Sequence, residues 1–410
     1  MIFKLYFILI ISFISIINSQ IIDTIIISGN KRTDSQIILR ELSHPLESKL
    51  DSTFLNQDKN KLYNLGLFSE VNIYRENNIY KIDLIESFSI VPIPIIDHNE
   101  DALDNKWTLG LGIVDINFLG QNQKVALGMT FLGDKIYIAN LFNPWFFGNH
   151  GSLEINLGNI DSYNIFHDIN INKIFYSVRV GGYFKDFHRL NFLIGNTKYE
   201  LDKTEKYNFN QIIFGYLYDK RNIYIDPTRG FLLGAKFSFN KDIYDRNDIS
   251  RISFIFNYYK IIHSKIFIDP VLAFKVKALF KYPNFDKLPI FEHEYLGGEN
   301  FIRGYKSNKP PTDIRLEYTN VIYNSFELQS TILARKNYSF NSLPGFEFGI
   351  DGLLFIDIGL GSNRYNEFYL DKALVGYGFG FKFFMSSGQN IAVIFGYNPY
   401  GQSHLHFRDD

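Results

Sequence analysis

Residues 376–383 read Gly-Tyr-Gly-Phe-Gly-Phe-Lys-Phe, an alternation of aromatic side chains with glycine or lysine. Successive side chains of a β-strand point to opposite faces of a sheet, so a two-residue repeat predicts a strand with one aromatic face and one small or polar face. The same repeat occurs at 125–131, 153–157, 231–239 and 252–258. The larger, C-terminal part of the chain is therefore expected to consist of strands.

Periodicity alone does not separate a membrane barrel from a soluble β-sandwich, because strands in both have one apolar and one polar face. From Trp107 onward we count about 16 such segments, many near the roughly 9–11 residues that a tilted membrane strand needs. The chain has 41 Phe and 27 Tyr, many of them at strand ends, as in the aromatic girdles of membrane barrels. These features favour a mainly β fold, a 16-stranded antiparallel transmembrane β-barrel over residues 107–410.

The N-terminus has the features of an export signal. Lys4 precedes an apolar run at 5–17, and small or polar residues follow at 18–20, which predicts a signal peptide over residues 1–19. No later apolar run approaches the roughly 18 residues of a membrane-spanning helix, so passage through a membrane would need strands. A net charge of −1 argues against a strongly basic nucleic-acid binder, and the lack of cysteine excludes disulfides and thiolate metal sites.

Residues 20–87 have a different pattern, which predicts one small α+β domain of order β-α-α-β-β. A β-branched run at 21–27 is followed by a turn, and Thr33 is a candidate N-cap for a helix at 36–42. A second helix opens near Asp51 and ends at Gly66. Two strands, Phe68–Arg75 and Ile79–Glu86, complete the domain. Residues 88–106, which contain Pro92 and Pro94, are expected to be a linker.

Residues 297–305, Gly-Gly-Glu-Asn-Phe-Ile-Arg-Gly-Tyr, resemble the Arg-Gly-Tyr/Phe loop motif of the BamA/TamA-type outer-membrane assembly family, the bacterial surface antigen family. Residues 63–71 resemble the helix-to-strand signature of a POTRA domain. The segments 355–359 and 376–380 match the C-terminal strands of the family. A mid-barrel hairpin motif is also similar, and it contains Asp219, Arg221, Pro227 and Gly230.

The resemblance covers essentially the whole mature chain and implies a 16-stranded barrel in the outer membrane with a POTRA domain in the periplasm. It also implies a weakly closed junction between the first and last strands, which helps nascent barrels enter the bilayer. Two features depart from the family. The chain has one POTRA-like unit where the best-known assembly proteins have several, and Arg408-Asp409-Asp410 follow the last aromatic residue, Phe407.

A long loop is expected to carry the main functional residues. With a periplasmic N-terminus, Phe280–Tyr318 lies between strands eleven and twelve on the outer side, and it is long enough to fold into the lumen. A buried Arg303 there needs carboxylate partners, and the two-residue repeat directs Glu327 and Asp357 inward. We therefore expect Arg303, Gly304 and Tyr305 to be held by Glu327 and Asp357, as the family resemblance also implies. The alternative is that Arg303 is one solvated charge among many.

Three further groups of residues are candidates for a structural or functional role. An edge strand of the N-terminal domain is a candidate for β-augmentation by a substrate or partner, with a purely structural edge as an equal alternative; its residues are Val71, Asn72, Ile73, Tyr74 and Arg75. The motif residues Asp219, Arg221, Pro227 and Gly230 are expected to shape a periplasmic hairpin. His404 and His406 share a strand face, but no third ligand has a diagnostic spacing, so no metal site is expected.

The sequence thus predicts a protein without catalytic residues or cofactor, located in the outer membrane with its N-terminal domain in the periplasm. The leading hypothesis is an assembly factor that binds unfolded β-barrel precursors and assists their insertion into the outer membrane. The alternative is a two-partner-secretion-type translocator that exports a dedicated polypeptide. The expected partners are these substrates, the lipid bilayer and periplasmic accessory proteins, and no nucleic acid. A third hypothesis, an outer-membrane enzyme, has no ordered Ser/His/Asp set to support it.

Overall fold

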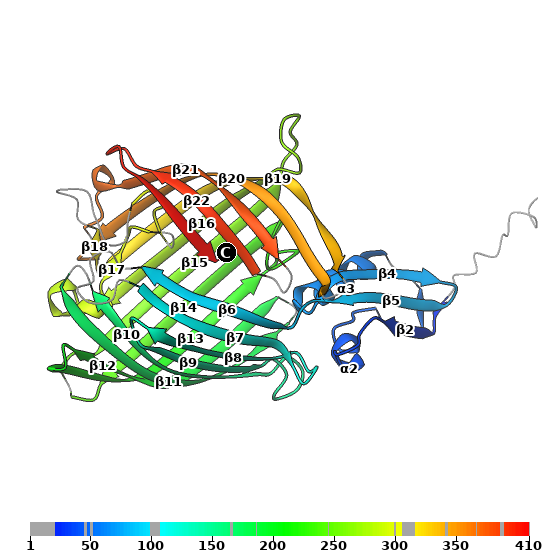
Figure 1. The fold of residues 1–410 in the computed structure, drawn as a ribbon, viewed down its shortest axis with the longest axis horizontal. Helices are drawn as coiled ribbons and strands as arrows, with labels where there is room; N and C mark the ends of the chain where they lie inside the picture. The colour runs from blue at the N-terminus through cyan, green and yellow to red at the C-terminus, as the bar shows by residue number, and fades with distance from the viewer. Residues whose placement is uncertain are drawn as a thin grey trace, which may run out of the picture.

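The computed structural model describes residues 21–44, 47–49, 52–98, 107–164, 167–185, 187–244, 246–298, 301–305, 316–340, 343–365, 367–385 and 389–409. The predicted signal peptide lies outside these residues. A small N-terminal domain sits at one end of a large barrel, and the short strands of a long loop lie at the other end (Figure 1). No helix in the described part of the chain is long and apolar enough to cross a bilayer.

The N-terminal domain is a three-stranded sheet packed on helices. Its sheet has the order β2-β5-β4, with β2 parallel and β4 antiparallel to β5, so β4 is an edge strand. Its core contains Ile38, Leu62, Tyr80 and Ile82, all fully buried. The elements are β1 (Ile21–Ile22), β2 (Thr24–Ser28), α2 (Ser35–Leu39), β3 (Ser48–Lys49), α3 (Ser52–Asn64), β4 (Phe68–Glu76) and β5 (Ile79–Glu86).

The first helix of this domain is shorter than expected and has a different cap. Asp34, not Thr33, is the N-cap of α2, and its carboxylate accepts the backbone N–H of Gln36 at 2.9 Å. The Thr33 hydroxyl oxygen instead accepts a hydrogen bond from the side-chain amide of Asn117 in the barrel, at 2.9 Å. The hydroxyl of Thr33 could cap the helix locally, but its contact with the barrel takes precedence.

The domain should fold without the barrel, because its ten fully or nearly fully buried apolar residues come from its own segments. We expect residues 21–87, expressed alone, to give dispersed amide NMR signals. A spectrum with the narrow dispersion of an unfolded chain would contradict the domain boundary.

Sixteen antiparallel strands form the barrel, as the sequence predicts, and each is hydrogen-bonded to its neighbours in the order β23-β22-β21-β20-β19-β16 and then consecutively to β6. They are β6 (Ile90–His98), β7 (Trp107–Phe118), β8 (Gln123–Leu132), β9 (Ile136–Asn143), β10 (Ser152–Asn164), β11 (Ile169–Phe184), β12 (His188–Leu201), β13 (Glu205–Asp219), β14 (Gly230–Asp242), β15 (Ile249–Ile261), β16 (Val271–Tyr282), β19 (Asn320–Phe340), β20 (Leu343–Ser362), β21 (Leu374–Met385), β22 (Gln389–Tyr397) and β23 (Ser403–Asp409).

The expected linker at 88–106 is wrong, because β6 lies within it and pairs along its whole length with β7. The barrel therefore begins at Ile90, not at residue 107. Proline is tolerated here because β6 is an end strand of the sheet. The N–H of Ile116 donates to the carbonyl of Ser89 at 2.9 Å, so odd-numbered residues of β6 bond to β7, and Pro92 and Pro94 face the free edge.

The direction of the apolar face identifies a barrel rather than a soluble sandwich. Leu127, Met129 and Phe131 are 58%, 54% and 73% exposed. The polar face points inward, where Ser238 and Asn240 are buried, and the Asn140 amide of β9 donates to Glu154 and Asn156 on the next strand. An outer wall of exposed apolar side chains around a polar interior is the pattern of a membrane barrel.

The N-terminal domain contacts several turns at one end of the barrel, which we call the domain-side mouth. The Asp34 N–H donates to the carbonyl of Gly120 in the β7–β8 turn at 2.9 Å. The Asn64 amide donates to the carbonyl of Asn222 in the β13–β14 turn at 3.2 Å. Tyr63 donates to Glu347 in β20 at 3.0 Å. Contacts to turns spaced around the rim place the domain across this mouth.

Candidate functional site

The long loop joins the eleventh and twelfth strands, β16 and β19, at the end of the barrel away from the N-terminal domain (Figure 1). It contains two short 3₁₀ helices, η1 (Phe285–Lys287) and η2 (Ile290–Glu292), and two paired strands, β17 (Glu294–Tyr295) and β18 (Glu317–Tyr318). Its described tip, residues 301–305, is buried: Arg303 has no exposed surface and Tyr305 is 1% exposed. Arg303 is therefore not a solvated loop charge.

Asp357 of β20 makes the densest set of contacts with Arg303. Its Oδ2 accepts from the Arg303 backbone N–H at 3.0 Å and from Nε at 2.7 Å, and its Oδ1 accepts from an Nη2 hydrogen at 2.6 Å. A side-on, two-oxygen contact of this kind uses the planar fork of arginine, which lysine lacks. Backbone and side chain of the loop are thus held by one carboxylate.

Glu327 and Ser325 of β19 complete the contacts of the guanidinium. Glu327 Oε1 lies 2.9 Å from Nη1 as an ion pair, and the Ser325 hydroxyl accepts from Nη2 at 2.8 Å. The guanidinium also stacks over the Phe355 ring, 3.7 Å from its centroid. Burial alone would lower the pKa of Arg303, but the charges of Glu327 and Asp357 outweigh it and raise the pKa above its ordinary value. We call Arg303, Gly304, Tyr305, Glu327 and Asp357 the loop lock.

Gly304 passes so close to the barrel wall that no side chain fits. Its φ is +105°, and a Cβ there would lie 2.3 Å from the carbonyl oxygen of Tyr397. Its N–H donates to His406 Nε2 at 3.1 Å, and its carbonyl accepts from the Asn398 amide at 2.8 Å. The loop tip is therefore joined to β23 as well as to β19 and β20.

One of the alternating glycines of β21, Gly376, is required at the same place. A Cβ on Gly376 would lie 1.8 Å from the carbonyl oxygen of Arg303. On β22, a Cβ at Gly396 would lie 2.4 Å from the Gly304 nitrogen. The two-residue repeat predicts the strand, and the buried loop explains why positions 376 and 396 are glycine.

The β13–β14 hairpin closes part of the domain-side mouth. Within it, Arg221 makes a two-oxygen pair with Asp219, at 2.9 and 2.8 Å, and Gly230 takes a φ of +100°. Its tip, which contains Pro227, reaches the other side of the barrel, where Asp226 pairs with Arg335 of β19 at 2.6 Å. The carbonyl of Ile225 accepts from Asn390 of β22 at 3.0 Å. These motif residues shape a hairpin that crosses the mouth.

The candidate edge strand has one part against the barrel and one part in the open. Ser69 accepts a hydrogen bond from Asn337 of β19 at 3.0 Å, so the start of β4 faces the barrel. Val71 is buried in the domain core, and Ile73 packs against that core. Asn72 and Tyr74 are exposed, and Arg75 bonds to the carbonyl of Asn77. Among the described residues β4 pairs only with β5.

Sequence reasoning missed several residues of the loop lock region. Tyr323 and Ser325 have the same inward parity as Glu327, so the repeat could have found them; the Tyr323 hydroxyl donates to Asp357 at 3.2 Å. His406 was weighed only as a metal ligand, because nothing in the sequence places a loop residue 102 positions away beside it.

A second notable feature is the junction between β6 and β23, which we call the seam. The 16-stranded sheet ends at these two strands, and no ladder joins them within the described residues. In the turn between β22 and β23, the N–H of Asn398 donates to the carbonyl of Gln402 at 3.1 Å, and the register of β23 continues from it without a shift. Even-numbered residues therefore bond to β22, and the backbone groups of 403, 405, 407 and 409 face the seam.

Family models match most of the chain. An Omp85 superfamily domain matches residues 117–383, and a POTRA model, described as surface antigen variable number repeat, matches residues 20–85. The first match alone covers more than half of the chain, which therefore belongs to the Omp85 superfamily. The fold and the family together are those of outer-membrane assembly and translocation proteins.

Solved structures agree on the fold. BamA from Haemophilus ducreyi lacking POTRA domains 1–3 is 14% identical with a TM-score of 0.56, over 94% of this chain and 82% of that one. CdiB from Escherichia coli is 11% identical with a TM-score of 0.53, over 94% and 89%. CdiB from Acinetobacter baumannii is 13% identical with a TM-score of 0.53, over 94% and 73%. No curated protein matches the sequence.

Replacing Arg303 should loosen the loop and the barrel. Arg303→Ala leaves the buried carboxylate of Asp357 without its cation, whereas Glu327 keeps its ion pair with Lys275 at 2.8 Å. Loss of one partner of a buried ion pair typically costs about 3–5 kcal/mol. We expect a lower temperature for the SDS-gel mobility shift between folded and unfolded barrel, and faster proteolysis of Phe280–Tyr318. Arg303→Lys should restore only part of the stability, because an ammonium does not span both carboxylates.

The control is Arg364→Ala, since the Arg364 side chain is 66% exposed and pairs with Glu367 at the surface, where such pairs contribute about 0–1 kcal/mol. A double-mutant cycle of Arg303→Ala with Asp357→Ala isolates the pair. Near-additive effects on barrel melting would mean that the two residues do not act together.

Proposed function

We propose that the protein is an outer-membrane assembly factor that binds unfolded β-barrel precursors and assists their insertion, with the N-terminal domain in the periplasm. The observation that carries the proposal is the seam, where two strands end the sheet without a ladder between them among the described residues. An unpaired strand edge presents a row of N–H and C=O groups to which another strand can add. A precursor strand is the natural occupant of such an edge.

The two edges of the seam differ in the backbone hydrogen-bonding groups that they present. Five residues of β6 face it, and two of them, Pro92 and Pro94, have no N–H to donate. The four residues of β23 that face it, Ser403, Leu405, Phe407 and Asp409, all keep both groups. An incoming strand therefore forms a complete ladder only on β23, and we propose that β23 is the strand that receives substrate.

Obstruction of the lumen favours insertion over export. The loop lock holds the long loop inside the barrel from the outer end, through Arg303 and Asp357. The β13–β14 hairpin crosses the domain-side mouth to Arg335 and Asn390. A translocator would have to break both sets of contacts to pass a chain, whereas insertion at the seam leaves them in place.

The N-terminal domain has a proposed role in delivery. The exposed side of β4, beyond its contact with Asn337, is an edge on which an extended precursor or a periplasmic accessory protein can add by β-augmentation. The domain lies against the same mouth as the β13–β14 hairpin, through Asn64 and Asn222. We propose no catalytic role and no cofactor.

Depleting the protein tests the proposed function. An assembly factor should lower the amounts of many unrelated outer-membrane barrels, measured by quantitative proteomics of outer membranes. Loss of a single secreted polypeptide, with the other barrels unchanged, would instead identify the translocator alternative.

Cross-linking tests the choice of strand, and it is simple because the chain has no cysteine. We compare Leu405→Cys in β23 with Ile96→Cys in β6, two seam-facing positions with exposed side chains. The probe is an eight-stranded outer-membrane protein with one cysteine in its terminal strand. Disulfides with the probe should form mainly in the Leu405→Cys variant. Adding both Pro92→Val and Pro94→Val to the Ile96→Cys variant should raise its disulfide yield. Preference for β6 in the unmodified background would contradict the assignment.

A further inference from the structure

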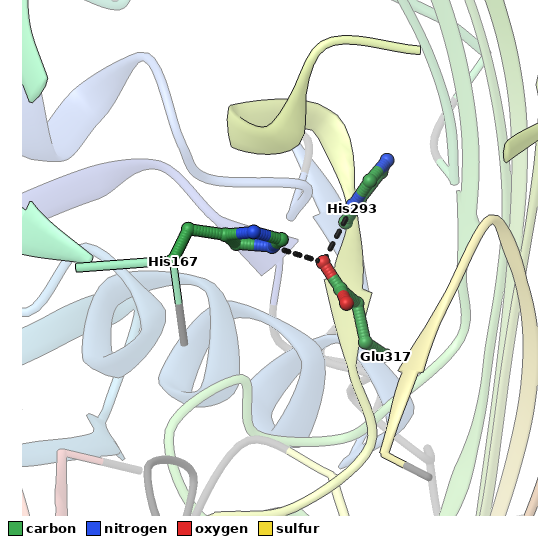
Figure 2. Close-up of side chains that lie close together, drawn as sticks. All are labelled: His167, His293 and Glu317. Carbon is green, nitrogen blue, oxygen red and sulfur yellow. Dashed lines mark hydrogen bonds and ion pairs between the residues drawn. The ribbon is translucent and has the colours of Figure 1, made fainter. Parts of the chain in front are cut away.

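Three side chains meet at the base of the long loop, at the outer end of the barrel (Figure 2). His293 lies between η2 and β17, Glu317 lies in β18, and His167 comes from the β10–β11 turn. Both imidazoles point at one oxygen, Glu317 Oε1: His167 Nε2 is 2.7 Å from it and His293 Nδ1 is 2.5 Å from it. The three ligand atoms lie within 4.8 Å of one another.

We propose that His167, His293 and Glu317 form a binding site for a divalent transition metal ion, with zinc as its first candidate. Two imidazole nitrogens and one carboxylate oxygen are a ligand set that zinc accepts, with a fourth position left for water. Metal–ligand bonds of about 2.0–2.2 Å would place such atoms a little over 3 Å apart, so a metal requires shifts of less than about 1 Å from the hydrogen-bonded arrangement.

The surroundings of the cluster hold the ligands in place. The Tyr295 hydroxyl donates to Glu317 Oε1 at 3.0 Å, the kind of outer contact that orients a metal-binding carboxylate. The Phe285 ring stacks on His293, with centroids 3.9 Å apart, and the His293 side chain is 4% exposed. His167, at 29%, stays open to solvent and gives an ion its path of entry.

The site would join two outer segments that are otherwise far apart in the chain. His293 and Glu317 flank the described tip of the long loop, and β17 and β18 pair next to them. His167 belongs to a different hairpin of the barrel. A bound ion would thus fix the base of the long loop to the wall, independently of the loop lock at its tip.

The test uses the full-length protein in detergent micelles, with zinc chloride as the probe in isothermal titration calorimetry. We expect about one ion per chain, and Co²⁺ in its place should give the intense visible absorption of a four-coordinate site. Glu317→Gln and His167→Gln should each weaken binding at least tenfold, since loss of even an outer-shell partner typically costs about 10–100-fold. Zinc should also slow proteolysis of the long loop.

His188→Asn is the matched control, because His188 contacts Tyr216 at the other end of the barrel and should leave zinc binding unchanged. His167→Gln is the variant least expected to disturb folding, because His167 lies in a partly exposed turn. This variant should keep the heat-modifiable gel mobility of the unmodified protein. Zinc binding that is equal in the unmodified protein, His167→Gln and Glu317→Gln would overturn the site, as would the absence of any binding by the unmodified protein.

Discussion

A guanidinium group with no exposed surface is tolerated in a protein only if its charge is compensated by nearby opposite charge. Two barrel strands compensate the charge of Arg303, with Asp357 from β20 and Glu327 from β19. The position of the remaining residues of the loop tip follows from that of Arg303. Once Arg303 is fixed, Gly304 must lie against the backbones of β21 and β22, and its N–H reaches His406 in the last strand. One charged group therefore determines where the outer loop, four inner-wall strands and the end of the chain meet.

The two-residue repeat predicted the strands, whereas the choice of a membrane barrel also needed the number of strands, the predicted signal peptide and the family resemblance. The repeat depends only on the alternation of side chains along a strand, so it also predicted the inward direction of Glu327 and Asp357, which are 3% and 0% exposed. Fifteen of the sixteen barrel strands lie after residue 106, where the repeat was counted. The expectation at 88–106 is wrong because Pro92 and Pro94 are typical of a linker, whereas the structure has the edge strand β6 there. Proline disfavours a central strand but not a free edge, and the sequence does not say which strand is the edge.

Some contacts between segments that are far apart in the chain could not be predicted from the sequence. Thr33 has a good local role as a cap, and only the position of Asn117 shows that its hydroxyl is used elsewhere. The β13–β14 hairpin was predicted as a hairpin, but its pairing with Arg335 depends on the curvature of the barrel. His167, His293 and Glu317 come from three segments with no common spacing, so no motif could have brought them together.

The prolines of β6 also bear on how copies of the protein behave in a crowded membrane. An exposed strand edge invites pairing with an identical edge on a neighbouring molecule, which leads to open-ended association. If two β6 edges paired, the carbonyls facing Pro92 and Pro94 would find no N–H donor, because proline has none. This homotypic pairing is therefore disfavoured. An edge for a foreign strand can therefore stay available on β23 with less risk that β6 edges assemble the protein on itself.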